Sequence, residues 1–185
     1  MATSKSLGEI FCEACENGNV EKVSFCIGLE VDVNCCGRYY RSGLHSSALN
    51  NHYQVVDILL QQPGIDVNIG GTQGEPTALN HACYRGNVEI VRRLLSRRDI
   101  NVNAISDHGD TALHNAAGCG HVDCVKLLLD CSALDVNKKA KWGSTAIVHA
   151  VRGNQRAVVE LLMRDRRIDL KTRDWEKRTL VQLAV

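Results

Sequence analysis

The chain has 185 residues and a formal net charge of +1, and 44% of its residues are apolar, 4% are aromatic and two are proline. This composition argues against disorder, while the two phenylalanines are too few to fill one thick globular core. No stretch approaches about 18 apolar residues and the first ten residues lack an apolar signal core, so neither a membrane span nor secretion is expected.

The first predicted helix begins close to the start of the chain. Ser6 is followed three positions later by Glu9, a pair typical of a capping box, in which each side chain bonds the other residue's backbone amide. The pattern predicts that a helix begins at Leu7 and that residues 1–6 form an N-terminal tail.

Short phrases of the form Asp-Val-Asn recur along the chain at a nearly constant interval. Their final residues stand 34, 35, 34 and 34 positions apart, and they are Asn34, Asn68, Asn103, Asn137 and, in a degenerate copy, Lys171. An interval of this size indicates one supersecondary unit repeated several times. The repetition predicts a binding scaffold and argues against a globular domain with a buried pocket.

A tight turn is predicted near the middle of every interval. It is marked by a column that contains only glycine and asparagine, the residues that most readily adopt a left-handed backbone at the end of a helix. The column consists of Gly18, Asn51, Gly86, Gly120 and Asn154.

Two helices are predicted on either side of this turn. Before it, small apolar residues at i, i+3 and i+4, such as Leu79, Ala82 and Cys83, predict a closely packed first helix. After it, a bulkier stripe predicts a second helix, for example at Val88, Val91, Leu94 and Leu95.

A loop of roughly eight residues connects each Asp-Val-Asn phrase to the next predicted helix. The helix is expected to begin beside a serine or threonine, whose hydroxyl can bond free backbone amides, at Ser42, Thr77, Thr111, Thr145 and Thr179. Glycines inside the loops predict tight β-type turns that project from the helices, at Gly37, Gly74, Gly109 and Gly143.

Taken together, these signals resemble the ankyrin repeat. The fourth unit carries the similarity most fully, in Thr111-Ala112-Leu113-His114, Gly120-His121-Val122 and Asp135-Val136-Asn137. The resemblance covers residues 7–185 and implies an all-α repeat solenoid of helix–turn–helix units with projecting β-turn fingers. The expected units are 7–34, 35–68, 69–103, 104–137 and 138–171, with a partial sixth unit at 172–185.

Nine cysteines could indicate a metal site or disulfides. Cys12-x-x-Cys15 and the adjacent pair Cys35-Cys36 superficially have a zinc-like spacing, but Cys12 and Cys15 fall at packed positions of a predicted first helix. We therefore interpret the cysteines as small apolar filler in a reducing compartment, and we expect no metal and no cofactor. The expected location is the cytoplasm, with the nucleus as an alternative.

A catalytic role is not expected from the sequence. His45 and His114 occupy the signature histidine position, where the resemblance implies that the imidazole braces the loop against the helix. No serine, cysteine or carboxylate stands in a recognisable nucleophile arrangement with them, and the sequence has no phosphate-binding or dinucleotide-binding glycine motif. The sequence therefore predicts a scaffold that is not an enzyme.

The resemblance also implies where a partner binds. Ankyrin stacks contact partners through the finger tips and through a palm, formed by the two positions before each turn. Carried over to this chain, the tips supply Arg38, Tyr39, Arg41, Asp107, His108, Lys141, Trp142, Trp175 and Arg178. The palm supplies Tyr84, Arg85 and Arg152. Trp, Tyr and Arg are enriched at binding hot spots, so the expected partner is another protein held in the groove.

The charges divide the chain into halves of opposite sign. Residues 1–91 carry a net charge of −5 and residues 92–185 carry +6. Lys138, Lys139 and Lys141 lie on one predicted finger with Trp142, so an acidic or oligonucleotide ligand is an alternative. A second alternative is a structural spacer in a longer protein, and we expect either a monomer or a part of a longer chain.

Overall fold

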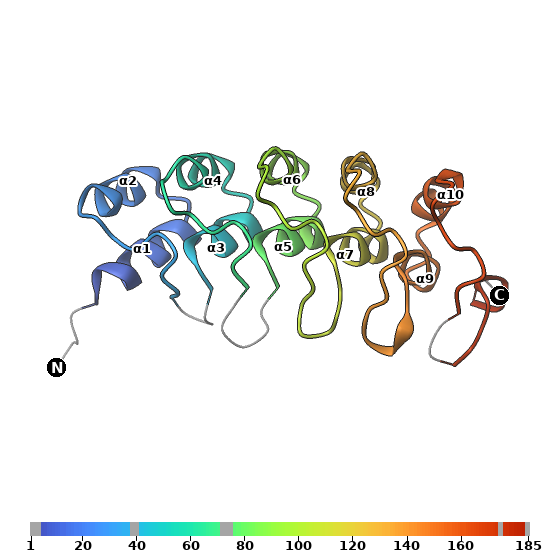
Figure 1. Cartoon of the computed structure of the whole chain (residues 1–185). Helices are drawn as coiled ribbons and strands as arrows, with labels where there is room; N and C mark the ends of the chain where they lie inside the picture. The colour runs from blue at the N-terminus through green and yellow to red at the C-terminus, as the bar shows by residue number, and fades with distance from the viewer. Residues whose placement is uncertain (1–4, 38–40, 71–75, 174–175, 184–185) are drawn as a thin grey trace.

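A computed structural model of the chain describes residues 5–37, 41–70, 76–173 and 176–183. Over these ranges the helices alternate between two rows (Figure 1). The first row consists of α1 (Leu7–Glu16), α3 (Gly43–Leu49), α5 (Ala78–Arg85), α7 (Ala112–Cys119) and α9 (Ala146–Arg152). The second row consists of α2 (Val20–Gly28), α4 (Tyr53–Leu60), α6 (Val88–Leu95), α8 (Val122–Leu129) and α10 (Arg156–Arg164). The all-α repeat fold expected from the sequence is confirmed.

Loops between the repeats project as fingers from the first row, on the side away from the second row (Figure 1). Helices pack on their neighbours within a repeat and on the same row of the next repeat, and the short α11 (Leu180–Leu183) packs on α9. Backbone hydrogen bonds close the described fingers, from Gly37 N to Arg41 O (2.9 Å), Ser106 N to Asp110 O (3.0 Å) and Ala140 N to Ser144 O (2.8 Å). Of the helices described, none has the length and apolar character needed to span a bilayer.

Each first-row helix from α1 to α9 begins after a serine or threonine, as predicted. The predicted capping box is present in α1, because Glu9 N donates to Ser6 Oγ (3.2 Å) and Ser6 N donates to Glu9 Oε2 (2.8 Å). In α7 an imidazole takes the role of this carboxylate, and the amide of Thr111 donates to His114 Nδ1 at 3.2 Å. His114 Nε2 also lies 3.1 Å from the carbonyl oxygen of Ser144, so the histidine braces the following finger.

The predicted turn column is left-handed at all five positions. The φ angles are 69° at Gly18, 62° at Asn51, 72° at Gly86, 80° at Gly120 and 54° at Asn154. These positive values explain why only glycine and asparagine occur there, since other side chains are strained in this region.

Substituting Gly86 with alanine is expected to lower the free energy of unfolding by about 2 kcal/mol. About half of this loss comes from the left-handed backbone at Gly86. The other half comes from steric contact, because the added Cβ would lie 2.5 Å from the His121 ring. The ring would then move away from the Tyr84 carbonyl oxygen, which His121 Nε2 contacts at 3.0 Å. Gly64→Ala is the matched control, because its φ is 78° but no atom lies within 4 Å of the added Cβ. Urea unfolding should show that Gly64→Ala lowers the free energy of unfolding by about 1 kcal/mol. Equal losses for the two variants would show that the contact with the His121 ring does not contribute.

The hydrophobic core is a series of thin layers, each formed by buried side chains of neighbouring repeats. Leu79, Ala82 and Cys83 are buried as predicted for a first helix. The predicted second-helix stripe is too narrow, because Ile90 is fully buried although the stripe omits it. The reason is that α6 packs on α5 and also on α4 and α8, so it buries a wider face than a helix with one neighbour.

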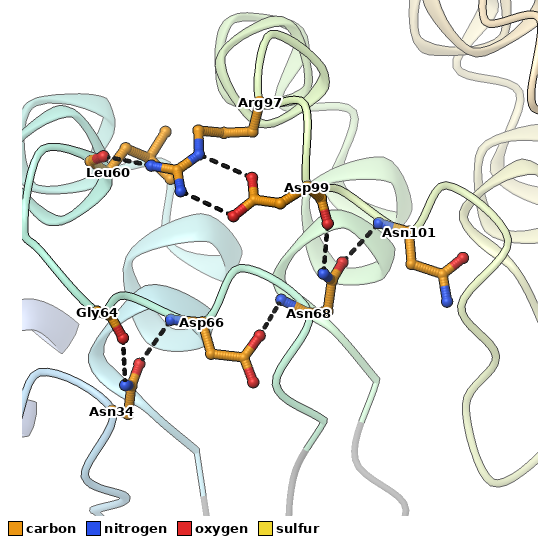
Figure 2. Close-up of polar contacts among 8 residues, drawn as sticks. All are labelled: Asn34, Leu60, Gly64, Asp66, Asn68, Arg97, Asp99 and Asn101. Carbon is orange, nitrogen blue, oxygen red and sulfur yellow. Dashed lines mark hydrogen bonds and ion pairs between the residues drawn. The ribbon is translucent and has the colours of Figure 1, made fainter.

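A ladder of asparagine side chains joins each repeat to the next along the base of the fingers (Figure 2). Asn68 Nδ2 donates to the carbonyl oxygen of Asp99 at 2.6 Å, while the amide of Asn101 donates to Asn68 Oδ1 at 2.6 Å. Asn34, Asn103 and Asn137 make the same pair of bonds to the repeat that follows each of them. The recurring phrase is therefore the sequence signature of a bond between repeats.

In each Asp-Val-Asn phrase, the side chain of the first residue orients the last residue. Asp66 Oδ1 accepts a hydrogen bond from the amide of Asn68 at 2.9 Å, and the same bond links residues two apart in the other four phrases. Such a bond holds the backbone in a local turn that aims the asparagine amide at the next repeat. At Lys171 the turn persists, but the side chain cannot supply the amide of the ladder.

Candidate protein-binding face

Nine of the twelve predicted contact residues fall within the described part of the chain. Arg38, Tyr39 and Trp175 lie outside the described residues. The other nine are Arg41, Tyr84, Arg85, Asp107, His108, Lys141, Trp142, Arg152 and Arg178. We call the surface formed by the fingers and the exposed ends of the first-row helices the finger face.

Trp142 is the most prominent predicted residue on this face. It lies in a short 3-10 turn, η2 (Lys141–Gly143), and its side chain is 75% exposed. Its backbone is left-handed, with φ 72° and ψ 12°, a conformation that is uncommon for a bulky residue. The turn is held because Gly143 N donates to the carbonyl oxygen of Ala140 at 3.0 Å. Strained backbone held in this way concentrates at functional positions.

Two neighbouring fingers are joined at their tips. The amide of Lys141 donates to the carbonyl oxygen of His108 at 3.0 Å, so the predicted residues of the fourth and fifth units form one continuous edge. Gly109 makes this approach possible, because a Cβ there would lie 2.7 Å from the nitrogen of Lys141. Asp107, His108, Lys141 and Trp142 are all exposed on this edge.

Palm residues occupy the C-terminal ends of first-row helices. Tyr84 is 51% exposed at the end of α5, and the guanidinium carbon of Arg85 lies 5.8 Å from the centre of its ring. Arg152 is exposed at the end of α9, and its charge contributes to the lowered pKa of His149, after burial as the main cause. Aromatic and guanidinium groups held side by side suit recognition of a protein surface.

Arg41 and Arg178 are less exposed than the other described tip residues. Arg41 is half-buried at the base of the first finger, where burial, His45, Arg41 and Arg85 lower the pKa of His81 to about 3. Arg178 Nη1 lies 2.8 Å from Glu176 Oε2, so this ion pair holds Arg178 locally.

A hollow of about 440 Å³ at the N-terminal end of the finger face was not anticipated from the sequence. It lies between α1, α3 and the first finger, and its walls include the acidic residues Glu9, Glu13 and Glu16. The spacing of these residues along α1 is the signal that could have indicated a shared acidic wall. Lys5 and Arg41 line the same hollow, and Lys5 pairs with Glu13 at 2.5 Å, so the hollow is only weakly acidic. The basic residues Arg85, Lys141 and Arg152 lie farther along the chain.

Part of the positive charge of residues 92–185 is engaged in bonds within the protein. Arg167 Nη2 donates to the carbonyl oxygen of Leu129 at 2.7 Å and pairs with Asp165 Oδ2 at 2.7 Å. Arg97 bonds the carbonyl oxygen of Leu60 in the same way, at 2.6 Å. These arginines bond free carbonyl groups at the end of the preceding second-row helix, which reduces the basic charge available for a ligand.

In the first-row helices Cys12, Cys15 and Cys83 are packed as predicted, but Cys119 is exposed, because it is the last residue of α7 before the turn at Gly120. Cys12 and Cys15 are buried in α1, and burial raises the pKa of Cys15 to about 12. Within the described ranges, no three metal-ligating side chains lie close enough to hold an ion. One contact between thiols, from Cys12 to Cys35, was not foreseen from the sequence.

Comparison with known proteins agrees with the fold. The family described as Ankyrin repeats (3 copies) matches residues 70–140 and 99–174, and Ankyrin repeats (many copies) matches residues 11–60 and 44–95. The chain is similar to YahD of Escherichia coli (strain K12), described as an ankyrin repeat protein, with 28% identity over 58% of this chain and 69% of that protein.

Two eukaryotic relatives match this chain over a small part of their own length. The human SMC5-SMC6 complex localization factor protein 1 is 36% identical over 50% of this chain, and BTB/POZ domain-containing protein 1 of Schizosaccharomyces pombe is 39% identical over 38%. The chain spans only 8% and 5% of these two proteins. The period, the ladder and the family matches lead to one conclusion: this chain belongs to the ankyrin repeat family.

Proposed function

We propose that this chain is a non-catalytic interaction module that binds another protein on its finger face. The observation that carries the proposal is Trp142, an indole that is 75% exposed on a strained turn beside the exposed Lys141. Burial of such a side chain against a partner removes a large apolar area from water. Family membership supports the same function, because ankyrin repeats generally mediate contacts between proteins.

The mechanism is preorganised binding. The asparagine ladder fixes the spacing of the repeats, and the bond from Lys141 N to His108 O fixes two finger tips relative to each other. A face that has its bound shape before contact loses little conformational entropy on association. The net negative charge of residues 1–91 and the net positive charge of residues 92–185 add orientation, since a partner with complementary charges is steered into one direction.

A second candidate is an acidic or single-stranded nucleic-acid ligand bound to the basic half of the chain, residues 92–185. Lys141 beside an exposed indole is the observation that favours it, because bases stack on indoles while lysines contact phosphates. The involvement of Arg167 in structural bonds makes this candidate weaker than the first. Binding of this kind would fall steeply as the salt concentration rises.

The test compares three forms of the chain as baits in a cell lysate, with quantitative mass spectrometry of what each captures. One bait is the wild type, and the second carries Trp142→Ala and Arg152→Ala on the finger face. The third carries Met163→Ala and Arg164→Ala, which lie exposed on α10 in the second row of the same repeat and also remove one large apolar side chain and one arginine. A set of proteins reduced at least about tenfold only in the second bait would support the proposal.

Other outcomes separate the alternatives. Nucleic acid released at moderate salt would favour the acidic-ligand candidate. Identical captures by all three baits would contradict binding through these residues and would favour a spacer role.

A further inference from the structure

The first repeat brings two cysteine thiols into contact. Cys12 on α1 and Cys35 at the start of the first finger are 23 residues apart in sequence, but their Sγ atoms lie 3.7 Å apart. Cys12 Sγ also lies 3.4 Å from the carbonyl oxygen of Cys35, and Cys35 Sγ lies 3.8 Å from that of Gly8. Each thiol is therefore held between its partner and the backbone of the opposite segment.

The finger base lies tightly against α1 beside the pair. A Cβ placed on Gly37 would lie 2.5 Å from the Cβ of Cys12, so only glycine allows this contact. A disulfide requires the two sulfurs to move from 3.7 Å to about 2.0 Å, a change that side-chain rotation and a small shift of the finger would have to supply.

The pair is also within reach of a small solute. Cys12 is only 5% exposed, but it lines the N-terminal hollow together with Cys36 and Gly37, and Cys35 is half-buried. The chain contains an internal contrast, because Cys83 and Cys124 interact with each other while both are fully buried. A thiol pair beside a hollow has a route for an oxidant that a pair inside the layers lacks.

The two thiols have unequal surroundings. The contact with Cys12 lowers the pKa of Cys35, against the opposing effects of burial and of Asp32. The same contact, burial and the neighbouring Cys35, Cys15 and Cys36 raise the pKa of Cys12. Cys35 is also the more exposed of the two thiols, so we take it as the one that an oxidant reaches first, and Cys12 is in contact with it to resolve the oxidised product.

We propose that Cys12 and Cys35 form a peroxide-reactive pair that closes into a disulfide and fixes the first finger to α1. The Cys35 thiolate attacks a hydroperoxide oxygen, the O–O bond breaks, and water or an alcohol leaves after taking up a proton. The sulfenic acid on Cys35 is then attacked by the sulfur of Cys12, which forms the S–S bond and releases water. Two thiols lose two electrons in total, and the peroxide is reduced by the same two electrons.

The disulfide would change the end of the finger face that carries the N-terminal hollow. It would close a covalent loop from α1 through α2 to the finger, and so restrict motion in the first repeat. Reduction by a small thiol would reverse the change. The inference concerns a chemical property of the first repeat, and it holds whether or not the finger face binds a protein.

The experiment treats the reduced full chain with one molar equivalent of hydrogen peroxide and maps disulfides after digestion with trypsin without reductant. Cys12 and Cys35 fall on separate peptides, residues 6–22 and 23–38, so a linkage is seen as a joined mass, and fragmentation assigns the cysteines. Cys35→Ser tests the pair, and Cys36→Ser is the matched control, because it changes the adjacent half-buried cysteine. The linkage map of the wild type is recorded first, and the two variants then identify the cysteine that forms the bond.

We expect the joined peptide in the wild type, where two of the nine thiols are lost, and also in Cys36→Ser. In Cys35→Ser the yield of the joined peptide should be at least about tenfold smaller. Hydrogen exchange of residues 7–28 should slow by about tenfold in the oxidised wild type and return on reduction. A linkage that survives in Cys35→Ser, one that is lost in Cys36→Ser, or peroxide consumption without the joined peptide would overturn the proposal.

Discussion

Lowering the pH from 7 to 5 is expected to reduce the free energy of unfolding by about 4 kcal/mol, because two buried histidines stay neutral in the folded chain. Burial is the main cause that lowers the pKa of His81 to about 3 and that of His114 to about 4. The ordinary value is 6.5, so each imidazole contributes about 2 kcal/mol to the change. Urea unfolding followed by circular dichroism across this pH range measures the effect.

The sign follows from where each state binds protons. Above pH 6.5 both histidines are neutral in the folded and unfolded states, and the free energy of unfolding does not depend on them. Below 6.5 the unfolded chain takes up protons that the folded chain does not, so stability falls as the pH decreases, to about pH 4 for His114 and about pH 3 for His81. His149, whose pKa is also lowered by burial, acts in the same direction.

Groups facing these histidines come from several elements. The rings of His114 and His149 lie 5.0 Å apart between centres, and His149 Nε2 lies 3.7 Å from Asp110 Oδ1. His149 lowers the pKa of His114, while the backbone bond to Ser144 and the charge of Asp135 raise it. His81 faces His45, Arg41 and Arg85, and all three oppose its protonation.

The chain itself suggests the control for this prediction. The third repeat has Asn80 at the position of His114, where its Nδ2 donates to the carbonyl oxygen of Asp110 at 3.0 Å, as His114 contacts Ser144. His114→Asn should therefore keep the brace, remove one titrating group and reduce the pH-dependent loss by about 2 kcal/mol. His108→Asn, on the exposed finger, should leave the loss unchanged. An unaltered pH profile for His114→Asn would show that buried histidines do not cause it.

Replacing Asn68 and Asn103 with alanine together should lower the free energy of unfolding by about 4 kcal/mol at pH 7. Each variant loses two hydrogen bonds to the backbone of the next repeat, and each such bond contributes about 1 kcal/mol. Denaturant unfolding gives the free energy, and hydrogen exchange should show the largest increase in the fingers of the third and fourth repeats.

Asn101→Ala is the control for the ladder. Asn101 belongs to the same set of phrases, but its side chain accepts one local bond, from the amide of Asn103 at 3.1 Å, and makes no bond to another repeat among the residues that the structure describes. Asn101→Ala should lower the free energy of unfolding by about 1 kcal/mol. If it costs as much as Asn68→Ala, then the bonds between repeats are not the source of the stability.

The sequence predicted most of the fold because the fold is repetitive. An error at one position, such as the omission of Ile90 from a helix stripe, was outweighed by the agreement of the same signals in the other units. The caps, the left-handed turns and the start of α1 at Leu7 were predicted correctly because each depends on a few neighbouring residues.

Contacts between neighbouring repeats were harder to predict. The pairing of Cys12 with Cys35 and the bond from Arg97 to the carbonyl of Leu60 depend on how one layer is rotated relative to the next, which the sequence period does not determine. The same geometry creates the N-terminal hollow. For the finger face, the sequence indicated which residues are exposed, and their role in binding stays a prediction that the substitutions above will test.

The ladder of asparagine bonds also determines how the molecule responds to a mechanical load. Because the helices described here pack mainly within a repeat and on the next repeat, a force applied along the stack would act on the interfaces in series. Rupture at one interface would release about 34 residues, on the order of 115 Å of extended chain, while the other interfaces remain closed. We expect the segment after Lys171, where the ladder has no asparagine, to yield first. Stretching is then expected to lengthen the chain one repeat at a time.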